Sequence, residues 1–456
     1  MKNSLYSIKE INSLFDRLFP LNRSILGEGY RKSLEILCEY IPFNLLSYPT
    51  GKQVLNWKIP KEWVIHEAFI EDLDNNRIID FKDNNLYVVN YSQPIDEVIP
   101  LDELKKHIFV SPHLEDAVPY TTSYYKDNWG FCMTQKQLLS MKNKNYHACI
   151  KSEFTDGRLV NGECLLEGES KKEILITAYL CHPSMANNEL SGPIVQAMLY
   201  QRIKNWKQRR FSYRFLINPE TIGSIAYISD HYESIKANTF AGLVLTCLGG
   251  LQDTFRLKKS RKEDSPFDLL VDRINDGTYS DFWEDNTPQD KRHIRVENFD
   301  PSCGSDERQY CSTGLNLPIS QIARKVYGSY PEYHTSLDNK DLMGMESLVD
   351  SCNKLERLLL LHEKEKYYQN NYPNGEIKLG DYALFPGVNT NGSRKDSSMN
   401  DIINNPAFIR RVMFLLNYSD GTKPLSYIAR RLGCSSSDLQ GVADILEEKG
   451  LIQIIK

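Results

Sequence analysis

The chain has 456 residues, of which 41% are apolar and 25% charged, a composition typical of a globular protein with two or three domains. Its formal net charge of −5 excludes the strongly basic surface of proteins that bind nucleic acid or anionic membranes. The sequence contains no run of about 18 apolar residues, so we predict no transmembrane helix and no membrane partner.

The N-terminal sequence and the cysteines both indicate a cytoplasmic protein. The first residues, MKNSLYSIKEINSLFDRLF, alternate charged and apolar side chains and lack the apolar core of a signal peptide. The ten cysteines are scattered without a CxxC pair, and most lie in apolar stretches. We therefore predict reduced, buried thiols rather than a disulfide framework.

The first 150 residues are predicted to contain a helical part and a β-rich part. Helical spacing of apolar residues predicts one helix in the first twenty residues and a second beginning near Arg31. From residue 51 to 150, short aromatic and β-branched segments such as LNWKIP, NNLYVVNYS and YHACIKSEF are interrupted by Pro, Asp and Asn. This pattern predicts a β-rich domain inserted into the chain at 51–150.

Residues 151–365 alternate between apolar strands and amphipathic helices. The segments EILITAYL, YRFLIN, FAGLVLTCL and LPISQIA have the character of buried strands, and runs such as IVQAMLYQRIKNW separate them. This alternation predicts a mainly parallel sheet flanked by helices. We predict that residues 1–50 and 151–365 together form this α/β domain.

The C-terminal part is predicted to be a winged helix that follows a linker. Residues 366–400 are polar and rich in turn residues, which indicates a linker, and residues 401–456 show helices separated by turns and a final β-like LIQII. This last segment carries seven Lys and Arg against six Asp and Glu, and its candidate recognition helix has acidic residues but no basic ones before Lys449. We therefore expect a protein partner, interdomain packing or a homo-oligomer rather than nucleic acid.

Four polar segments lie at the ends of predicted elements in the α/β domain, and each contains candidate site residues. They are CHPSMANNELSG (181–192), NPETIGS (218–224), GSDERQY (304–310) and YPEYHTSLDN (330–339). Each has a structural alternative: a hydrogen-bonded core histidine, a helix cap or a surface ion-pair cluster. Their succession within one α/β domain favours a site at the carboxyl edge of the sheet.

The residue types in these segments suit metal-assisted hydrolysis. Catalytic zinc takes about three protein ligands and keeps one open position. His182, His334 and one oxygen ligand supply such a set, and a nearby glutamate not bound to the metal can accept a proton.

The segments resemble those of the zinc aminopeptidase superfamily. HPSMANNELSG is similar to its first metal-binding segment, YHTSLDN to its last, and SDER to a segment near the substrate. Over roughly residues 20–345 the chain resembles, more closely, a bacterial family of aminopeptidase-like proteins with an inserted β-rich domain and a C-terminal winged helix. Matching stretches include NRSILGEGYR, VPYTTSYYKDNWGFC and YRFLINPETIGSIAYIS. The resemblance implies a zinc-exopeptidase-like fold.

The resemblance also implies roles for individual residues. His182 and His334 take the positions of metal-binding histidines, and Glu220 takes the region of the catalytic glutamate. Asn188 stands where the superfamily has an aspartate that bridges two metals, and no further acidic ligand occurs in the segment Thr246–Gly249. The resemblance therefore implies one zinc ion rather than two.

The third zinc ligand, the base and the substrate contacts have alternatives. Asn188 is the first choice for the oxygen ligand and Glu220 the second. If Glu220 binds the metal, either Glu189 or Glu307 is expected to be the base or catalysis is expected to be weak. Asp306 and Arg308 are expected to bind the amine and the carboxylate of a substrate.

The function predicted from these residues is zinc-dependent, aminopeptidase-like hydrolysis of an amide bond in a small peptide or amide substrate, with a suggested link to surface-polysaccharide metabolism. One alternative is a deacylase of an amino sugar or another small amide, which would use the same fold and metal. Another is a binding or scaffold protein with a decayed site, because acidic ligands of the superfamily are missing here.

Overall fold

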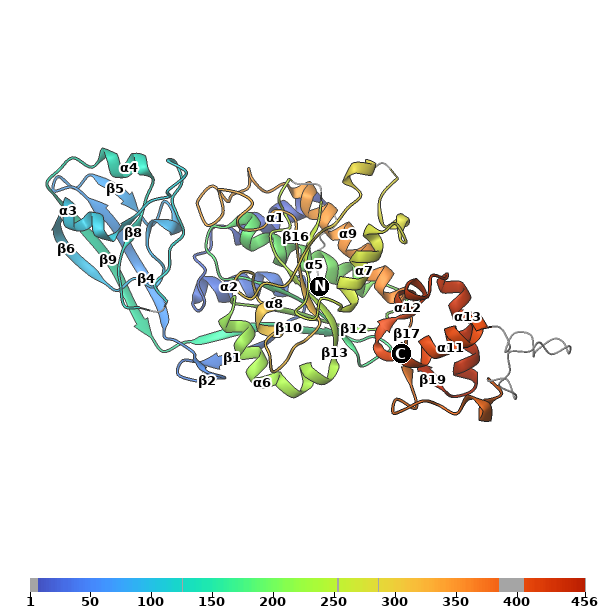
Figure 1. Ribbon diagram of the computed structural model, residues 1–456. Helices are drawn as coiled ribbons and strands as arrows, with labels where there is room; N and C mark the ends of the chain where they lie inside the picture. Colours follow the sequence, from blue (N-terminus) through green and yellow to red (C-terminus); the bar gives the residue numbers. More distant parts are fainter. Residues whose placement is uncertain (1–6, 125, 252–253, 286, 385–405, 456) are drawn as a thin grey trace. The chain divides into compact units, whose positions relative to one another are not determined.

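The computed structural model describes residues 7–124, 126–251, 254–285, 287–384 and 406–455 (Figure 1). The chain forms two compact units. Unit 1 comprises Met1–Asp264 and Val271–Leu358, and unit 2 comprises Ser265–Leu270 and Leu359–Lys456. None of the helices described is both long and apolar enough to cross a membrane.

Unit 1 is built on an eight-stranded mixed sheet with the order β1-β10-β12-β11-β13-β16-β14-β15. Its strands are β1 (Asn44–Pro49), β10 (Arg158–Leu166), β12 (Ser212–Asn218), β11 (Glu173–Tyr179), β13 (Thr239–Leu245), β16 (Ile319–Ala323), β14 (Arg256–Lys258) and β15 (Arg295–Glu297). The four central strands, β12, β11, β13 and β16, are parallel to one another. The predicted α/β class is therefore confirmed.

The flanking strands make the sheet less parallel than predicted. β1 and β10 run antiparallel to their neighbours, and β14 runs antiparallel to β16. β1 and β10 are the strands that lead into and out of the inserted domain, so β1 lies within the first fifty residues, which were expected to be helical. The central strand β11 is buried along its whole length, as expected for a strand covered on both faces.

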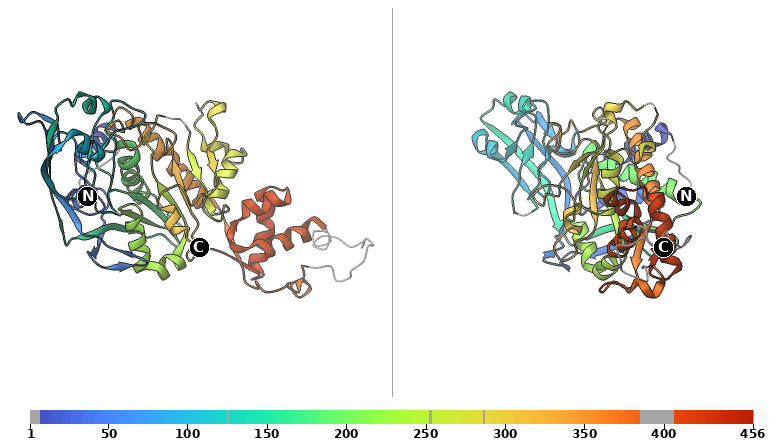
Figure 2. Two further views of the ribbon diagram at one scale, coloured as in Figure 1. Left: turned by 60° about the vertical axis from the view of Figure 1, so that its left-hand side comes forward. Right: turned by 45° about the vertical axis from the view of Figure 1, so that its right-hand side comes forward.

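Helices pack along this sheet (Figure 2). α5 (Ser191–Lys204) contacts β11 and β13, and α6 (Ile222–Asn238) contacts β10 and β13. α1 begins with a capping box between Ser7 and Glu10 and contacts α5. The remaining helices are α1 (Ile8–Leu18), α2 (Glu28–Cys38), α7 (Pro266–Asn275), α8 (Glu307–Tyr310) and α9 (Met345–Lys364), of which α7 and α9 contribute residues to both units.

The insert is a small β-rich domain between β1 and β10. Its four-stranded antiparallel sheet has the order β5-β4-β9-β6, and its strands and short helices are β2 (Gln53–Val54), β3 (Trp57–Lys58), β4 (Glu62–Glu71), β5 (Arg77–Asp80), β6 (Ile95–Pro100), α3 (Leu101–Leu104), β7 (Ile108–Phe109), β8 (Phe131–Cys132), α4 (Gln135–Ser140) and β9 (Asn145–Thr155). Buried aromatic and aliphatic side chains, among them Trp63, Tyr91 and Phe131, form its core. β9 continues slightly past residue 150 before the chain returns to the central sheet.

In the described residues of its C-terminal part, unit 2 has the helices α11, α12 and α13 and a three-stranded sheet with the order β18-β17-β19. Its elements are β17 (Tyr367–Asn370), α11 (Pro406–Tyr418), β18 (Asp420–Pro424), α12 (Leu425–Leu432), α13 (Ser436–Glu448) and β19 (Ile452–Ile454). β17 lies inside the predicted linker 366–400, because buried Tyr367 and Tyr368 pair with the two later strands. The rest of that prediction, from residue 385 onward, lies outside the described residues.

Candidate functional site

Two strand ends bring a histidine and a glutamate together at one edge of the central sheet. β11 ends at Tyr179, and the chain continues through Cys181 to His182. β12 is its parallel neighbour, with Asn218 opposite Tyr179, and Glu220 follows shortly after. Because the strands run in the same direction, their continuations leave the sheet together, and His182 Nε2 lies 3.8 Å from Glu220 Oε2.

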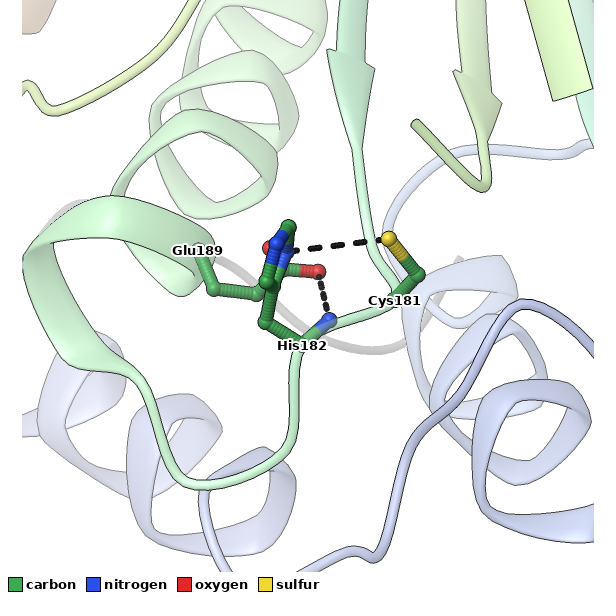
Figure 3. A group of neighbouring side chains, drawn as sticks. All are labelled: Cys181, His182 and Glu189. Atoms are coloured by element: carbon green, nitrogen blue, oxygen red, sulfur yellow. Dashed lines mark hydrogen bonds and ion pairs between the residues drawn. The ribbon is translucent and has the colours of Figure 1, made fainter. Parts of the chain in front are cut away.

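The imidazole of His182 is held in one orientation by Glu189. This glutamate belongs to a π-helical turn, Ala186–Leu190, that leads into α5. One carboxylate oxygen of Glu189 lies 2.6 Å from His182 Nδ1, and the other accepts the backbone N–H of His182 at 2.9 Å (Figure 3). A carboxylate at Nδ1 places the proton there, so Nε2 is the nitrogen available to a ligand.

Cys181, His182 and Glu189 form a tight buried group in which the potential ligand atoms all lie within 4.8 Å of one another (Figure 3). The 2.6 Å contact between His182 Nδ1 and Glu189 is nevertheless a hydrogen bond. Two ligand atoms on a tetrahedral zinc ion lie about 3.3 Å apart. Glu189 therefore orients His182 and does not share an ion with it through Nδ1.

Burial and neighbouring groups act in opposite directions on the pKa of His182. Burial lowers it, whereas Cys181 and Glu189 raise it, and the net pKa lies well above the usual range. Burial raises the pKa of the Cys181 thiol to about 11, so this thiol is neutral at physiological pH. Glu189 is then the charged partner that favours the protonated ring.

His334 approaches the same position from the loop after β16. Its backbone φ of 55° lies in the left-handed region, which non-glycine residues adopt rarely. The ring centres of His334 and His182 are 5.1 Å apart. Two imidazoles on one tetrahedral zinc ion place their ring centres about 5 Å apart, so the spacing suits a shared ion.

The ring of His334 lacks the hydrogen bonds that His182 has. Its Nε2 is buried and has no hydrogen-bond partner among the residues the structure describes. Burial, together with the neighbouring His182, holds the pKa of His334 well below its usual value. A buried neutral nitrogen without a partner is a suitable donor to a metal ion.

The inserted domain fixes the loop that carries His334. Pro119 and Thr335 form an antiparallel bridge, and the backbone N–H of Tyr120 donates to the carbonyl of His334 at 2.8 Å. The Tyr120 ring lies edge-on to both imidazoles, with its centre 5.2 Å from His182 and 5.3 Å from His334. Tyr120 was not among the predicted site residues, although it lies in the aromatic segment VPYTTSYY.

Glu220 is held by one carboxylate oxygen and presents the other to His182. Its Oε1 accepts the hydroxyl of Ser305 at 2.7 Å, and its backbone N–H donates to Cys181 Sγ at 3.3 Å. The side chain keeps 25% of its surface exposed, so the carboxylate remains accessible to small molecules. Burial raises the pKa of Glu220, and the charge of His182 partly offsets this effect.

The side chain of Asn188, predicted as the oxygen ligand, makes its hydrogen bond to Tyr179 and does not line the cavity beside the histidines. Its Oδ1 accepts the hydroxyl of Tyr179 at 3.2 Å, and its Nδ2 is buried without a partner in the described structure. The reason is the π-helical turn, whose backbone N–H groups at Asn187 and Asn188 are held by the buried carboxylate of Asp338 at 2.6 and 2.9 Å. The sequence did not reveal this turn.

Asp306, expected to bind the amine of a substrate, holds a loop together. It is fully buried, and its two oxygens accept from the Thr221 backbone at 2.7 Å, the Ser224 hydroxyl at 3.0 Å and the Asn218 amide at 2.8 Å. Burial, together with the charge of Glu220, raises the pKa of Asp306 to about 7. Three of its acceptor sites are thus used within the chain, and Asp306 is not among the residues that line the cavity beside the histidines.

The other charged residues of the SDER segment are also engaged within the chain. The Nε of Arg308 donates to the Ser305 carbonyl at 3.2 Å. Glu307, one of the alternative bases, is fully buried and pairs with Lys258 Nζ at 2.9 Å, and it accepts the Ser305 backbone N–H at 2.9 Å. Ser305, the residue that this segment actually contributes to Glu220, was not predicted.

A cavity of about 310 Å³ opens beside the two histidines and Glu220. The α/β part contributes Cys181, His182, Glu220, Thr221, Ile222 and His334, while the insert contributes Trp57, Lys58, Tyr120, Thr122 and Tyr124. Asn188, Asp306 and Arg308 are not among its lining residues. The cavity therefore unites three of the predicted site residues and adds a wall of aromatic side chains from the insert.

Family models match almost the whole chain. Residues 12–365 match the family described as a domain of unknown function, DUF4910, and residues 366–454 match a winged helix-turn-helix family. A protein of Clostridium acetobutylicum, named for polysaccharide biosynthesis and an aminopeptidase-like domain, is 35% identical over 100% of this chain and 98% of its own.

Solved structures agree with this assignment. A crystal structure from Clostridium acetobutylicum, described as a peptidase, is 34% identical and has a TM-score of 0.75 over 98% of this chain and 96% of its own. A zinc aminopeptidase from Bacillus subtilis is 11% identical, with a TM-score of 0.55 over 78% of this chain and 95% of its own. A peptidase M28 precursor from Shewanella amazonensis is 12% identical, with a TM-score of 0.52 over 78% and 92%.

The two distant structures show a shared fold, and the near relative covers both parts of the chain. The predicted resemblance to aminopeptidase-like proteins with an inserted β-rich domain and a C-terminal winged helix is thereby confirmed. The chain belongs to the DUF4910 family of aminopeptidase-like proteins and carries a winged helix-turn-helix domain after it.

Proposed function

We propose that the cavity beside His182, His334 and Glu220 is the active site of a zinc-dependent hydrolase that cleaves an amide bond in a small substrate. The observation that carries this proposal is the pair of imidazoles, 5.1 Å apart, of which one leaves Nε2 buried without a partner. Relatives in fold that are named zinc aminopeptidases support zinc as the ion.

The two histidines would hold the metal through their Nε2 atoms. His182 is already oriented for this role, because Glu189 occupies Nδ1. His334 is held through its backbone by the insert, so its ring stays beside that of His182. A zinc ion bound there supplies Lewis-acid polarisation of a substrate carbonyl.

Glu220 would act as the general base and acid that transfers a proton from the attacking water to the leaving amine. Ser305 fixes its Oε1, which leaves Oε2 on the side of His182 Nε2 and within the cavity. Oε2 accepts a proton from the attacking water and then delivers it to the nitrogen of the leaving amine. The raised pKa of Glu220 brings the carboxyl closer to the pH at which such a transfer works in both directions.

The volume of the cavity limits the size of the substrate that it can hold. A volume of about 310 Å³ lies at the lower end of the range for small-molecule sites, and residues of the insert close one side of it. We therefore propose a dipeptide-sized or smaller amide rather than a protein chain. The relative named for polysaccharide biosynthesis supports an amino-sugar amide as one substrate of this size.

A second candidate is a metal-binding protein that does not hydrolyse its ligand. It is favoured by the positions of the acidic groups, because Glu189 is bound to His182 and Glu307 to Lys258. If Glu220 completed the metal shell, no other carboxylate lining this cavity would remain to act as base. In that case the protein would bind small ligands through the metal without cleaving them. Its winged helix would then bind a partner protein that responds to the bound ligand.

The variant Glu220→Gln separates these two functions. For the hydrolase, the purified variant keeps its zinc but loses at least about a hundredfold in kcat on aminoacyl and N-acyl amino-sugar amides, because a general base contributes about 10²–10⁴. Loss of zinc together with activity would identify Glu220 as a ligand. Wild-type protein that binds zinc but cleaves neither substrate class would favour the second candidate, a metal-binding protein without hydrolase activity. Glu115→Gln, an exposed position outside the cavity, is the matched control.

The state of the cysteines supports a cytoplasmic location. All ten thiols are free in the structure, and seven of them are buried. Free buried thiols are typical of proteins in a reducing compartment. We propose that the protein acts in the cytoplasm, and measurement of its distribution after cell fractionation tests this.

A further inference from the structure

The far edge of the central sheet has a polar face. β14 lies between β15 and β16, and the register places Arg256 beside Arg295 on one side and Ala323 on the other. Two residues along, Lys258 lies between Glu297 and Gln321. Because side chains alternate along a strand, these residues share one face, while Leu257 and Ile322 point into the core on the other.

This polar face forms part of a second cavity, of about 820 Å³. Segments 298–303 and 326–329 contribute the remaining lining residues, among them Asp300, Cys303 and Tyr327. The second cavity shares no lining residue with the cavity beside the histidines. It is a separate space with its own polar groups.

Two hydrogen-bond donors on this face are buried without partners. The Nε of Arg256 and the side-chain nitrogen of Gln321 have no hydrogen-bond partner among the described residues, and Gln321 is only 3% exposed. Buried donors in native proteins are almost always paired, so these two indicate missing acceptor atoms. Both unsatisfied groups are donors, and oxygen atoms of a ligand would complement them.

The charged neighbours of these donors define what fits. Arg256 and Arg295 both contact the carboxylate of Glu297. The Nε of Arg295 lies 3.7 Å from Glu297 Oε1, and Arg256 forms a shorter ion pair with the same oxygen. Lys258 donates to the carbonyls of Asp300 and Cys303 and to Glu307, so no ammonium proton is left for a ligand.

The carboxylate of Asp300 accepts from the hydroxyl and backbone of Ser302 through one oxygen, and these bonds lower its pKa, so it keeps its negative charge. The groups that can donate to a ligand include two guanidinium groups and the Gln321 amide, with Glu297 and Asp300 as their present counter-charges.

We propose that this second cavity binds a small-molecule anion whose phosphate or carboxylate oxygens accept from Arg256, Arg295 and Gln321. Guanidinium groups present paired donors that match such oxygens, and Gln321, which lines the same cavity, supplies a further amide donor. The volume accommodates a molecule larger than a single phosphate. The proposal is independent of metal binding at His182 and His334.

Calorimetric titration of full-length, chelator-treated protein with pyrophosphate tests the site. We expect one saturable binding event that Arg256→Met and Gln321→Leu each weaken by about tenfold, the usual effect of one hydrogen bond to a charged group. Glu297→Gln removes the competing carboxylate and tightens binding. Arg158→Met, an exposed arginine in β10, leaves the affinity unchanged, as does His182→Ala.

The site is overturned if wild-type protein shows no saturable binding, or if folded Arg256→Met and Gln321→Leu bind pyrophosphate as tightly as wild type. It is also overturned if Arg158→Met weakens binding as much as they do. Loss of binding in His182→Ala would move the anion to the other cavity and would also reject this proposal. Thermal unfolding of every variant confirms that the compared proteins are folded.

Discussion

The loops that carry His182 and His334 put the same side chain into opposite surroundings. His182 has a carboxylate on Nδ1, and its backbone carbonyl accepts from the fully buried Arg23 at 3.0 Å. His334 has a left-handed backbone and an Nε2 without a partner in the described structure. One histidine is oriented by hydrogen bonds to its ring, and the other by the backbone of its loop.

This difference explains why the two pKa values shift in opposite directions. Both rings lose solvent, but only His182 gains a carboxylate to stabilise its charged form. A divalent ion between the rings would remove the conflict, because both would then be neutral donors. The loops are also tied together, since Asp338 from the His334 loop holds the turn that carries Glu189.

Removing the hydrogen bonds by which Asp338 connects the two loops is expected to have the largest effect on stability. Asp338→Ala leaves the buried N–H groups of Asn187 and Asn188 and the Tyr330 hydroxyl without their acceptor. We expect the free energy of unfolding in urea to fall by about 3 kcal/mol. Asp338→Asn, which keeps one acceptor oxygen, should lose less than half of this. A loss below about 1 kcal/mol in Asp338→Ala would show that the turn is held by other contacts.

Glu189→Gln tests whether the contact at Nδ1 of His182 matters for metal binding. The amide removes the charge at Nδ1 but preserves the shape of the side chain. We expect zinc affinity, measured by competition with a chelator, to fall by about 10- to 100-fold. Glu115→Gln is the exposed control. Unchanged affinity would mean that the Glu189 contact does not prepare His182 for the metal.

Tyr120→Phe tests whether the insert acts through its ring or its hydroxyl. The hydroxyl of Tyr120 lies 3.1 Å from that of Tyr124, whereas the ring contacts both histidines. We expect a loss of about 1 kcal/mol in unfolding free energy and unchanged zinc affinity. Tyr120→Ala, which removes the ring, should weaken zinc binding in the same assay. Equal zinc affinity in both variants would show that the ring of Tyr120 does not contribute to the metal site.

A substitution at His147, a histidine outside the cavity, is expected to have the smallest effect on stability, and it can be compared with His182 and His334. His147 contacts Asp96 at 2.7 Å and Glu71 at 3.0 Å, but it keeps 30% of its side chain exposed. Hydrogen bonds to Asp96 and Glu71 raise its pKa above the unfolded value of about 6.5, so the protonated ring stabilises the fold. This contribution is fully present below about pH 6.5 and is lost as the pH rises through the raised pKa.

His147→Gln should therefore be less stable than wild type at pH 6, by less than about 1 kcal/mol, and closer to it at pH 9. Urea unfolding at the two pH values measures this difference. A difference that grows with pH would contradict the assigned direction of the pKa shift.

The sequence predicted those parts of the site that follow from strand order. His182 and Glu220 follow neighbouring parallel strands, and two apolar strand patterns suffice to predict their proximity. The direction of Asn188 could not be predicted, because a π-helical turn rotates its side chain toward Tyr179. Asp306 turned inward because the backbone N–H of Thr221 needs an acceptor, a requirement that arises only in the folded loop.

The aromatic insert was expected to wall the cleft, but which of its residues contacts the histidines could not be predicted from the sequence. Tyr120 reaches the histidines through pairing with residues more than two hundred positions later in the chain, which no local pattern encodes. The strand Tyr367–Asn370 was missed likewise, since its partners β18 and β19 lie far along the chain, at 420–424 and 452–454, and the surrounding residues are polar.

The metal content of protein purified without chelators tests the central claim most directly. Wild-type protein, His182→Ala and His334→Ala are compared by mass spectrometry of bound zinc, with circular dichroism to confirm folding. We predict about one zinc ion per wild-type chain and its loss in each variant, because both imidazoles are needed for one site. A folded wild type without zinc, or either variant with a full equivalent, would contradict it.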